Sequence, residues 1–431
     1  MKIGMISEHA SPLAVLGEAD AGGQNVHVAA LAQRLAADGH TVDVYTRRDD
    51  PALPERVPLT DGVDVVHVDA GPPERLPKDD LLRWMDQFGD DLAARFTDPE
   101  ARPDVLHAHF WMSGLAALRA TRRADDDLPA VPVVQTFHAL GSVKRRYQGA
   151  ADTSPTARIP LERTLCADVD LVIATCQDEV RELRQLGATD DRVRVVPCGV
   201  DLGVFTPGTA RTHQEDEDRP LRLLSLGRLV ERKGVATVVE ALARLGDGAP
   251  PVELLVAGGP PLGELDRDPE VRQLRDRAER LGVGDRVRFL GAVSHEDVPN
   301  LLRDVDVVAC TPWYEPFGIV PLEAAACGLP VIASAVGGML DTVVHERTGL
   351  LVPPRDPAAV ADALLRLSDR RFRLRLGAGA RVRAERQYGW AAVARQTAEA
   401  YAEVVSSSSA RRPLPQRSAT GAPLVSAGGT R

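Results

Sequence analysis

Short apolar runs alternate with helix-length amphipathic segments along most of this 431-residue chain. An apolar run of four to six residues suits a strand that is buried on both faces, and an intervening helix lets the next strand run parallel to the last one. The alternation therefore predicts an α/β fold built from parallel βαβ units. Because 431 residues exceed the size at which one hydrophobic core keeps growing, we expect two or three domains.

The alternation forms two series. The first series predicts strands at Lys2–Ile6, Val42–Thr46, Val63–Val68, Val105–Ala108, Val131–Thr136, Leu171–Ala174 and Val193–Val196, with helices such as Gln24–Ala37, Lys78–Phe96 and Asp178–Leu186. The second predicts strands at Leu221–Leu226, Val252–Ala257, Val287–Leu290, Val307–Cys310, Val331–Ala333 and Leu350–Val352, with helices such as Gly234–Leu245 and Glu270–Leu281. Two similar series predict two Rossmann-like domains that face a central cleft, where ligands bind at the carboxyl ends of the strands.

The segment boundaries follow from composition. We expect an N-terminal domain over 1–202, a linker rich in Gly, Pro and acidic residues over 203–220, and a second domain over 221–385. The pattern is continuously helical from Phe372 to about Val404, and we assign 386–404 to a C-terminal helix. Residues 405–431 are rich in Ser, Pro and Gly, so we expect a disordered tail.

Charge and hydropathy exclude several classes of protein. A net charge of −10 and a pI near 5.6 argue against nucleic acid or an anionic membrane as a partner. No apolar run approaches the ~20 residues that span a bilayer, and the N-terminus has the pattern of a strand rather than of a signal peptide, so we expect a cytoplasmic protein. The five cysteines show no C-x-x-C spacing, which predicts reduced thiols in the core.

Two loops carry features that suit a diphosphate. Gly22 and Gly23 open a helix, where backbone N–H groups can approach an anion, although a tight strand-to-helix turn would also use glycine. In "LSLGRLVERKG", Arg228 and Lys233 offer a guanidinium fork and a point charge, although both could be solvated loop charges. Neither the G-x-G-x-x-G dinucleotide motif nor the P-loop motif is present, which disfavours a dinucleotide-dependent oxidoreductase and P-loop chemistry.

The stretch "EPFGIVPLE" places Glu315 just before a turn and Glu323 in the helix that follows it. Ionised carboxylates accept strong hydrogen bonds from hydroxyl groups, so both residues suit the diols of a sugar or a ribose. The alternative is a pair of surface glutamates stabilised by the positive end of a helix dipole.

Histidines follow two strands of the first series. His138 leads into the basic run "KRRY", which begins at Lys144 and would lie at the edge of the cleft. His107 and His109 end the preceding strand, but no carboxylate or cysteine completes a metal-binding set, and we expect no metal ion. A structural role for these histidines stays open.

Taken together in this order, the motifs resemble the retaining glycosyltransferases of family 4, over residues 2 to about 404. The resemblance implies the GT-B fold, with the C-terminal helix crossing back to the first domain. It also implies transfer of a sugar from a UDP- or GDP-sugar, used as a co-substrate without a cofactor, to a hydroxyl group of a small polar acceptor. The anomeric configuration would be retained without a metal ion.

The resemblance also assigns roles to the matching residues on the donor side. Arg228 and Lys233 would bind the diphosphate, and Glu323 the ribose. Glu315 and the backbone N–H groups of Phe317, Gly318 and Ile319 would contact the transferred sugar, and His138 would lie at the reaction centre. Gly22 and Gly23 would let the loop of the first domain close over the phosphates.

On the acceptor side, members that use inositol phosphate build a phosphate pocket that Asn25, Lys78, Thr136 and Arg158 match. Phe110 stands where those enzymes have tyrosine, and Lys144 adds a positive charge nearby. The expected acceptor is therefore phosphorylated or anionic and similar to D-inositol 3-phosphate. Sucrose-phosphate synthases share the "GGQ" variant of the first loop, so a sugar phosphate is a second candidate. The alternatives are a sugar-nucleotide epimerase of the same fold, which would not need an acceptor pocket with Lys78 and Arg158, and a non-catalytic binding module, which the intact Glu315, His138 and Lys233 disfavour. The oligomeric state, including a homodimer, stays open.

Overall fold

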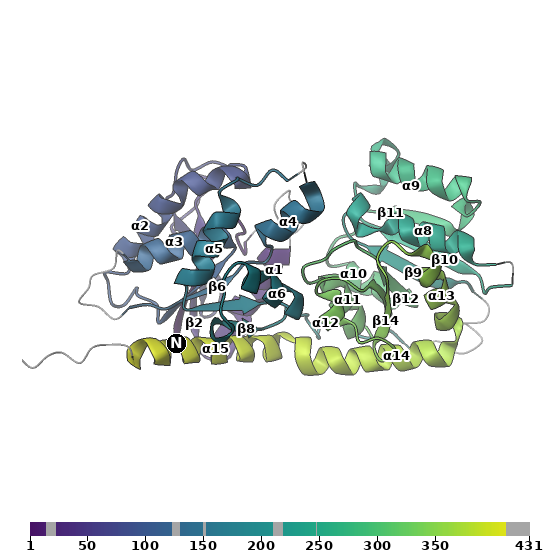
Figure 1. Cartoon of the computed structure of the whole chain (residues 1–431). Coiled ribbons are helices and arrows are strands. Elements are labelled where there is room, and N and C mark those ends of the chain that lie inside the picture. Colours follow the sequence, from purple (N-terminus) through teal and green to yellow (C-terminus); the bar gives the residue numbers. More distant parts are fainter. Residues whose placement is uncertain (14–22, 123–129, 150–151, 210–218, 247, 411–431) are drawn as a thin grey trace, which may run out of the picture.

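The chain forms two α/β domains, each built on a mainly parallel sheet, and the two lie side by side in Figure 1. This computed structural model describes residues 1–13, 23–122, 130–149, 152–209, 219–246 and 248–410. Residues 210–218, half of the linker predicted at 203–220, and the glycine at position 22 lie outside the described residues. The fold expected from the sequence, with two Rossmann-like domains around a cleft, is confirmed.

The first domain has an eight-stranded sheet in the order β3-β4-β2-β1-β5-β6-β7-β8, parallel except for β3. Its strands are β1 (Lys2–Ile6), β2 (Thr41–Arg47), β3 (Arg56–Thr60), β4 (Val63–Val68), β5 (Val105–His109), β6 (Val133–Thr136), β7 (Leu171–Ala174) and β8 (Val193–Val195). Its helices are α1 (Gly23–Ala37), α2 (Met85–Arg95), α3 (Trp111–Arg122), α4 (Gly141–Gln148), α5 (Arg158–Asp168) and α6 (Gln177–Gln185), with 3₁₀ turns η1 (Lys78–Trp84) and η3 (Asp190–Arg192).

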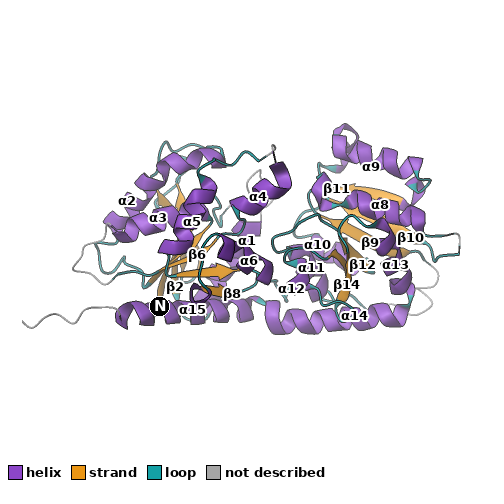
Figure 2. Ribbon diagram, in the orientation of Figure 1, coloured by secondary structure: helices purple, strands orange, loops and turns teal. Residues whose placement is uncertain are grey.

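The second domain has a six-stranded, fully parallel sheet in the order β11-β10-β9-β12-β13-β14. Its strands are β9 (Leu221–Leu226), β10 (Val252–Ala257), β11 (Val287–Gly291), β12 (Val307–Cys310), β13 (Val331–Ser334) and β14 (Gly349–Val352). Its helices are α8 (Val235–Arg244), α9 (Pro269–Arg280), α10 (Val298–Arg303), α11 (Ile319–Ala326), α12 (Met339–Thr342), α13 (Pro357–Ser368) and α14 (Arg370–Arg383), with short turns η4 (Glu231–Lys233), η5 (Leu262–Arg267) and η6 (Gly284–Arg286). Helices cover the sheets in both domains (Figure 2).

All the predicted strands are present to within two residues, but the sequence reasoning missed β3. This strand pairs antiparallel at the edge of the first sheet, its residues alternate between exposed and half-buried, and Pro58 interrupts it. An edge strand of this kind lacks the continuous apolar run that marks the buried strands. The predicted helix Lys78–Phe96 also begins as the 3₁₀ turn η1 and becomes α-helical only at Met85.

The C-terminal helical segment crosses between the domains, but it is interrupted rather than continuous. A π-helical turn, η7 (Ala384–Tyr388), follows α14, and Gly389 is extended before α15 (Trp390–Ala410) begins. The Val200 N–H donates to the Tyr388 carbonyl at 2.8 Å, so the interruption lies where this segment meets the other segment that joins the domains. Figure 1 shows α14 under the second domain and α15 under the first.

Apolar side chains of α15 complete one face of the first domain's core. Val393 and Tyr401 pack in the cluster that contains Ile3 and Met5 of β1. The helix continues to Ala410, so the disordered tail predicted from residue 405 is wrong for its first six residues. Residues 411–431 lie outside the described part.

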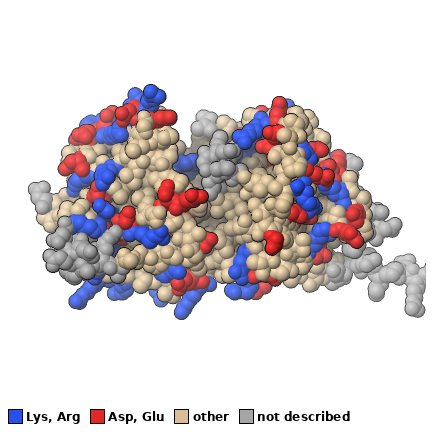
Figure 3. Space-filling view, turned by 180° about the vertical axis from the view of Figure 1, so that it is seen from behind, with Lys and Arg blue, Asp and Glu red and all other residues tan. Residues whose placement is uncertain are grey.

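Two other expectations concern the core and the surface. All five cysteines are buried and unpaired, as predicted. None of the helices in the described residues is both long enough and apolar enough to cross a membrane. On the face shown in Figure 3, acidic and basic side chains are intermixed on both sides of the hollow between the domains.

Candidate active site

A cleft of about 690 Å³ lies between the domains and is lined by residues of both. It lies at the carboxyl ends of central strands of both sheets, where parallel α/β sheets bind ligands. Of the residues singled out from the sequence, the cleft is lined by Gly23, Asn25, Lys78, Phe110, His138, Lys144 and Arg158 of the first domain and by Arg228, Lys233, Glu315, Phe317, Gly318 and Ile319 of the second.

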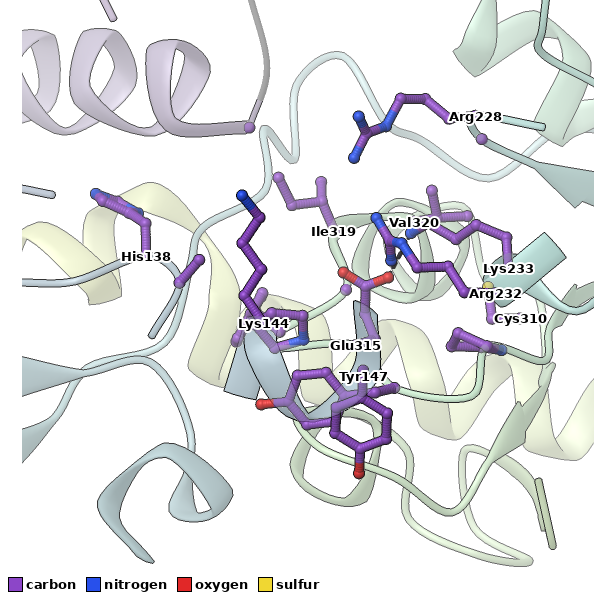
Figure 4. Close-up of a pocket in the computed structure, with 18 of the residues that line it drawn as sticks. His138, Lys144, Tyr147, Arg228, Arg232, Lys233, Cys310, Glu315, Ile319 and Val320 are labelled. Atoms are coloured by element: carbon purple, nitrogen blue, oxygen red, sulfur yellow. Dashed lines mark hydrogen bonds and ion pairs between the residues drawn. The ribbon is translucent and has the colours of Figure 1, made fainter. Parts of the chain in front are cut away.

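Three cations from one loop line the second domain's wall. Arg228 is exposed in the turn after β9, and Arg232 and Lys233 belong to η4 (Figure 4). The Lys233 ammonium donates to the Glu315 carboxylate, and burial lowers the pKa of the Arg232 guanidinium. The sequence reasoning missed Arg232, although its place beside Lys233 in the same loop was a usable signal. Three cations and one carboxylate on the same wall leave an excess of positive charge that suits a diphosphate.

A glycine shapes this loop. Gly234 has φ 75°, and a Cβ there would lie 1.9 Å from the Thr311 carbonyl oxygen. Only glycine therefore allows η4 to turn into α8 this close to the strand that precedes Glu315.

The segment after β12 directs Glu315 and a helix N-terminus into the cleft. Gly318 has φ 85° and precedes α11, whose first-turn N–H groups have no partner within the helix. The Glu315 carbonyl accepts a 3.0 Å hydrogen bond from the Gly338 N–H, which fixes the loop to the start of α12. The positive end of α11 and the three cations therefore act on the same part of the cleft.

Glu323 does not line the main cleft, whereas Glu315, the other glutamate of the motif, does. Its side chain is buried and lines a separate cavity of about 50 Å³ together with His27, His295 and Trp390. Burial raises the pKa of Glu323 to about 7. The small cavity shares Cys198 and Ile319 with the main cleft, so the two glutamates line adjoining cavities.

His138 enters the cleft from the end of β6 with a left-handed backbone, φ 58°. Its Nε2 atom lies 3.0 Å from Nδ1 of the buried His109, which the sequence reasoning named only as a weak metal candidate. Burial and the neighbouring histidines lower the pKa values of both rings well below their usual range. The two rings are therefore neutral near pH 7, and one donates a hydrogen bond to the other.

Phe110 lies between two cations on the first domain's wall. The Lys78 Nζ lies 5.3 Å and the Arg158 Cζ 5.0 Å from the centroid of its ring, and the centroids of the His9 and Phe110 rings are 4.8 Å apart. These distances place both cations within cation–π range. Phe110 also has a positive φ of 86°, which is uncommon for a residue of this size.

Arg158 and Lys144, two basic residues of this wall, are held by acidic and hydroxyl partners. Arg158 donates to Glu162 at 2.8 Å and to Ser154 at 3.2 Å, and Lys144 lies 3.1 Å from Asp152 and donates to Ser154 at 2.9 Å. These contacts fix the cations in place before any ligand arrives.

Besides Glu323, one other described residue expected at the site, Thr136, does not line the cleft. Thr136 is buried, and its hydroxyl lies 2.8 Å from His107 Nε2 instead of lining the cleft. The structure therefore gives Thr136 a contact within the core, because the last residue of β6 points into the sheet's packed face. Gly22 lies outside the described residues, whereas Gly23 contacts the second domain: a Cβ there would lie 3.0 Å from Ile319 Cδ1.

No group of three or more His, Cys, Asp or Glu side chains with the geometry of a metal site occurs in the described part of the chain.

Two family models together match most of the chain. The model described as Glycosyltransferase Family 4 matches residues 21–204, and the model described as Glycosyl transferases group 1 matches residues 209–383. The boundary between the two matches coincides with the segment between the domains.

Relatives of known name align over nearly their full length. The D-inositol 3-phosphate glycosyltransferase of Xylanimonas cellulosilytica is 38% identical over 424 residues, which cover 95% of this chain and 98% of that protein. The enzyme of the same name from Corynebacterium glutamicum is 34% identical over 416 residues, which cover 94% and 97%.

Solved structures agree with this assignment. A sucrose-phosphate synthase from Thermosynechococcus elongatus superposes with a TM-score of 0.79 and 32% identity, covering 94% of this chain and 99% of that one. The Anabaena protein HepE, solved in complex with UDP and glucose, has a TM-score of 0.66 and 21% identity, covering 94% and 100%, and shows the shared fold alone. The sequence identity over full length, both family models and the two-domain cleft together show that the chain belongs to the family-4 glycosyltransferases of the GT-B fold and is a glycosyltransferase.

Proposed function

We propose that this enzyme transfers a hexose from a nucleoside-diphosphate sugar to a hydroxyl group of a small phosphorylated acceptor, with retention of the anomeric configuration. The observation that carries the proposal is the distribution of charge in one cleft: Arg228, Arg232 and Lys233 line one wall, and Lys78 and Arg158 line the other. Two separate cationic regions suit a donor diphosphate and an acceptor phosphate. The family relationship favours this reaction over a sugar-nucleotide epimerase.

On the donor side, Arg228 and Lys233 bind the diphosphate in place of a metal ion, and Arg232 adds a third positive charge. The N–H groups at the start of α11 point to the same anion, and Glu315 accepts hydrogen bonds from the transferred hexose. Glu323 binds a ribose hydroxyl that reaches it from the main cleft past Ile319, a residue that lines both cavities. Preorganised positive charge stabilises the leaving diphosphate in the transition state.

In the transfer step, the bond between the anomeric carbon and the leaving phosphate oxygen breaks, and a bond from that carbon to the acceptor oxygen forms on the same face. The acceptor's hydroxyl proton passes to the leaving phosphate. Of the described residues that line the cleft, Glu315 is the one with a carboxylate, and Lys233 binds it. This pairing supports a hydroxyl-binding role for Glu315 rather than that of a nucleophile.

On the acceptor side, Lys78, Lys144 and Arg158 offer positive charge, and Asn25 lines the same wall. An acceptor similar to D-inositol 3-phosphate follows from the names of the relatives. A sugar phosphate is the second candidate, because Phe110 offers no hydroxyl to a phosphate and the sucrose-phosphate synthase superposes well. A screen of donors against inositol phosphates and sugar phosphates distinguishes the two acceptors.

Calorimetry with UDP and GDP, each with and without Mg²⁺, tests the donor side. We expect binding of one nucleotide to be independent of Mg²⁺ and to weaken at least 10-fold in Lys233→Ala, because a charge-assisted contact to phosphate is lost. Lys2→Ala is the matched control, since Lys2 starts β1 and so lies at the end of the strand away from the cleft. Binding that requires Mg²⁺, or that survives in Lys233→Ala, would contradict the diphosphate assignment.

The stereochemistry has its own test: NMR of the product from an α-linked donor should show an α-linkage, and a β-linked product excludes retention. The cytoplasmic location and the homodimer stay predictions, which cell fractionation and analytical ultracentrifugation test.

A further inference from the structure

Two tyrosines from different domains stack at the edge of the cleft. Tyr147 belongs to α4 of the first domain, and Tyr314 belongs to the segment between β12 and α11 of the second. Their ring centroids are 4.6 Å apart and their planes differ by 14°. Tyr314 also packs against the hydrophobic core of the first domain, so a side chain of the donor-binding domain is seated on the acceptor-binding domain.

Tyr314 immediately precedes Glu315, the residue proposed to bind the transferred hexose. Lys233 and Gly338 hold Glu315 from within the second domain. A Cβ on Gly337 would lie 2.1 Å from the Glu315 carbonyl oxygen, so this loop is closely packed on that side. The stack with Tyr147 therefore supplies the contact from across the cleft (Figure 4).

Helix α4 is itself fixed to the first domain. Arg146 makes two hydrogen bonds with Glu182, at 2.7 and 2.9 Å. Lys144, one turn before Tyr147, lies 3.1 Å from Asp152. These contacts of Arg146 and Lys144 fix α4, the helix that carries Tyr147, to the first domain.

We propose that Tyr147 is a positioning residue for Glu315: by stacking on Tyr314, it holds the hexose-binding carboxylate in place from the opposite domain. The hexose-binding part of the donor site is then complete only when the two domains are in contact. The charged groups assigned to the diphosphate and the ribose, in contrast, all belong to the second domain: Arg228, Arg232, Lys233 and Glu323. This inference rests on the proposed function, because it needs a hexose at Glu315.

The test compares a nucleoside diphosphate with its sugar conjugate. Calorimetry with UDP and UDP-glucose, and with GDP and GDP-mannose, gives the affinity that the hexose adds for whichever pair the wild-type enzyme binds. In Tyr147→Ala we expect this added affinity to fall by about 2- to 12-fold, the range of a lost aromatic pair, while the affinity for the nucleoside diphosphate changes less than 2-fold. Tyr147→Phe keeps the stacked ring and should behave as the wild type.

Leu281→Ala is the matched control, because Leu281 is 41% exposed, close to the 44% of Tyr147, and lies after α9, outside the cleft lining. The exposure of Tyr147 also means that its truncation leaves the core intact. An equal loss for both ligands, or no loss in Tyr147→Ala, overturns the inference while the proposed function stands. If the wild-type enzyme binds neither nucleotide nor sugar nucleotide, the proposed function fails, and this inference fails with it.

Discussion

Two residues at the cleft have backbone conformations that their side chains disfavour. Phe110 and His138 follow β5 and β6 with φ values of 86° and 58°. For residues other than glycine such conformations cost of order 1–3 kcal/mol, and they persist where the surrounding structure imposes them. Both side chains line the cleft, so the strain coincides with the groups that would meet the substrates.

Glu323 gives a prediction at the scale of one residue. Its pKa is about 7 in the folded protein, against 4.5 for the free side chain. As the pH rises, Glu323 therefore loses its proton at a lower pH in the unfolded chain than in the folded protein. Ionisation thus favours the unfolded chain, and the free energy of unfolding decreases as the pH rises from about 4.5 to about 7. Glu323→Gln removes this loss, so we expect the variant to gain stability over the wild type with rising pH, up to about 3 kcal/mol at pH 8.

Urea unfolding of both proteins between pH 4.5 and pH 8 measures this difference. Glu296→Gln serves as the control, because Glu296 is exposed and its substitution should produce no pH-dependent difference. A constant difference between Glu323→Gln and the wild type across this range would show that the burial of Glu323 does not oppose its ionisation.

At the scale of the elements, the cleft depends on how its helices begin. Helices α1 and α11 both start at the cleft, with Gly23 and Ile319 in contact range across it. The apolar residues of "EPFGIVPLE" pack α11, while the glycine before it sets the direction in which the helix starts. A change at this glycine should therefore affect ligand binding as well as stability.

Gly318→Ala is the corresponding prediction. A Cβ would lie 2.8 Å from Met339 Cε at φ 85°, so we expect a stability loss of about 1–2 kcal/mol and at least a 5-fold weaker affinity for the donor nucleotide. Gly187→Ala is the matched control: its φ is 99°, but a Cβ there would meet no atom within 4 Å. Chemical denaturation and calorimetry should show both variants destabilised and only Gly318→Ala impaired in binding. Equal donor affinity in the two variants would contradict the role assigned to the α11 N-terminus.

At the scale of the whole molecule, a group of buried histidines joins the cleft to the crossing helix. His107 Nδ1 lies 2.6 Å from the Tyr401 hydroxyl of α15, and the His107 and His109 rings are 4.0 Å apart. The His27 ring contacts both Trp390 of α15 and His138. Because α15 continues from the second domain, these rings lie where the halves of the molecule are tied together.

This group predicts a loss of stability in mild acid. Burial lowers the pKa of His27 to about 4, whereas the unfolded side chain titrates near 6.5. Its contribution to stability is therefore complete above pH 6.5 and is lost as the pH falls toward 4, by up to about 3 kcal/mol. His27→Phe should flatten the fall in unfolding free energy between pH 6.5 and 4.5 relative to the wild type, as urea unfolding across this range measures. An equally steep fall in His27→Phe would assign the acid sensitivity to other groups.

The sequence by itself determined the parts of this protein that local pattern encodes. Buried parallel strands appear as apolar runs, so every strand of the two sheets except β3 could be placed, and the loop glycines and charges pointed to an anion between two Rossmann-like domains. β3 escaped because an exposed edge strand with a proline carries no such run. The interruption at Gly389 escaped because helical periodicity is unaffected by one residue that another segment holds extended.

Only the tertiary structure decided which side chains meet. In the folded protein Lys233 binds Glu315, and Glu323 lines an adjoining cavity. The Thr136 hydroxyl contacts His107 in the core, and the ring of Tyr147 stacks on that of Tyr314. Each of these outcomes depends on residues far apart in the chain, and their distances are set by how the two domains and the crossing helix pack. Spacing along a sequence specifies local direction, whereas the packing of distant segments fixes the contacts across a cleft.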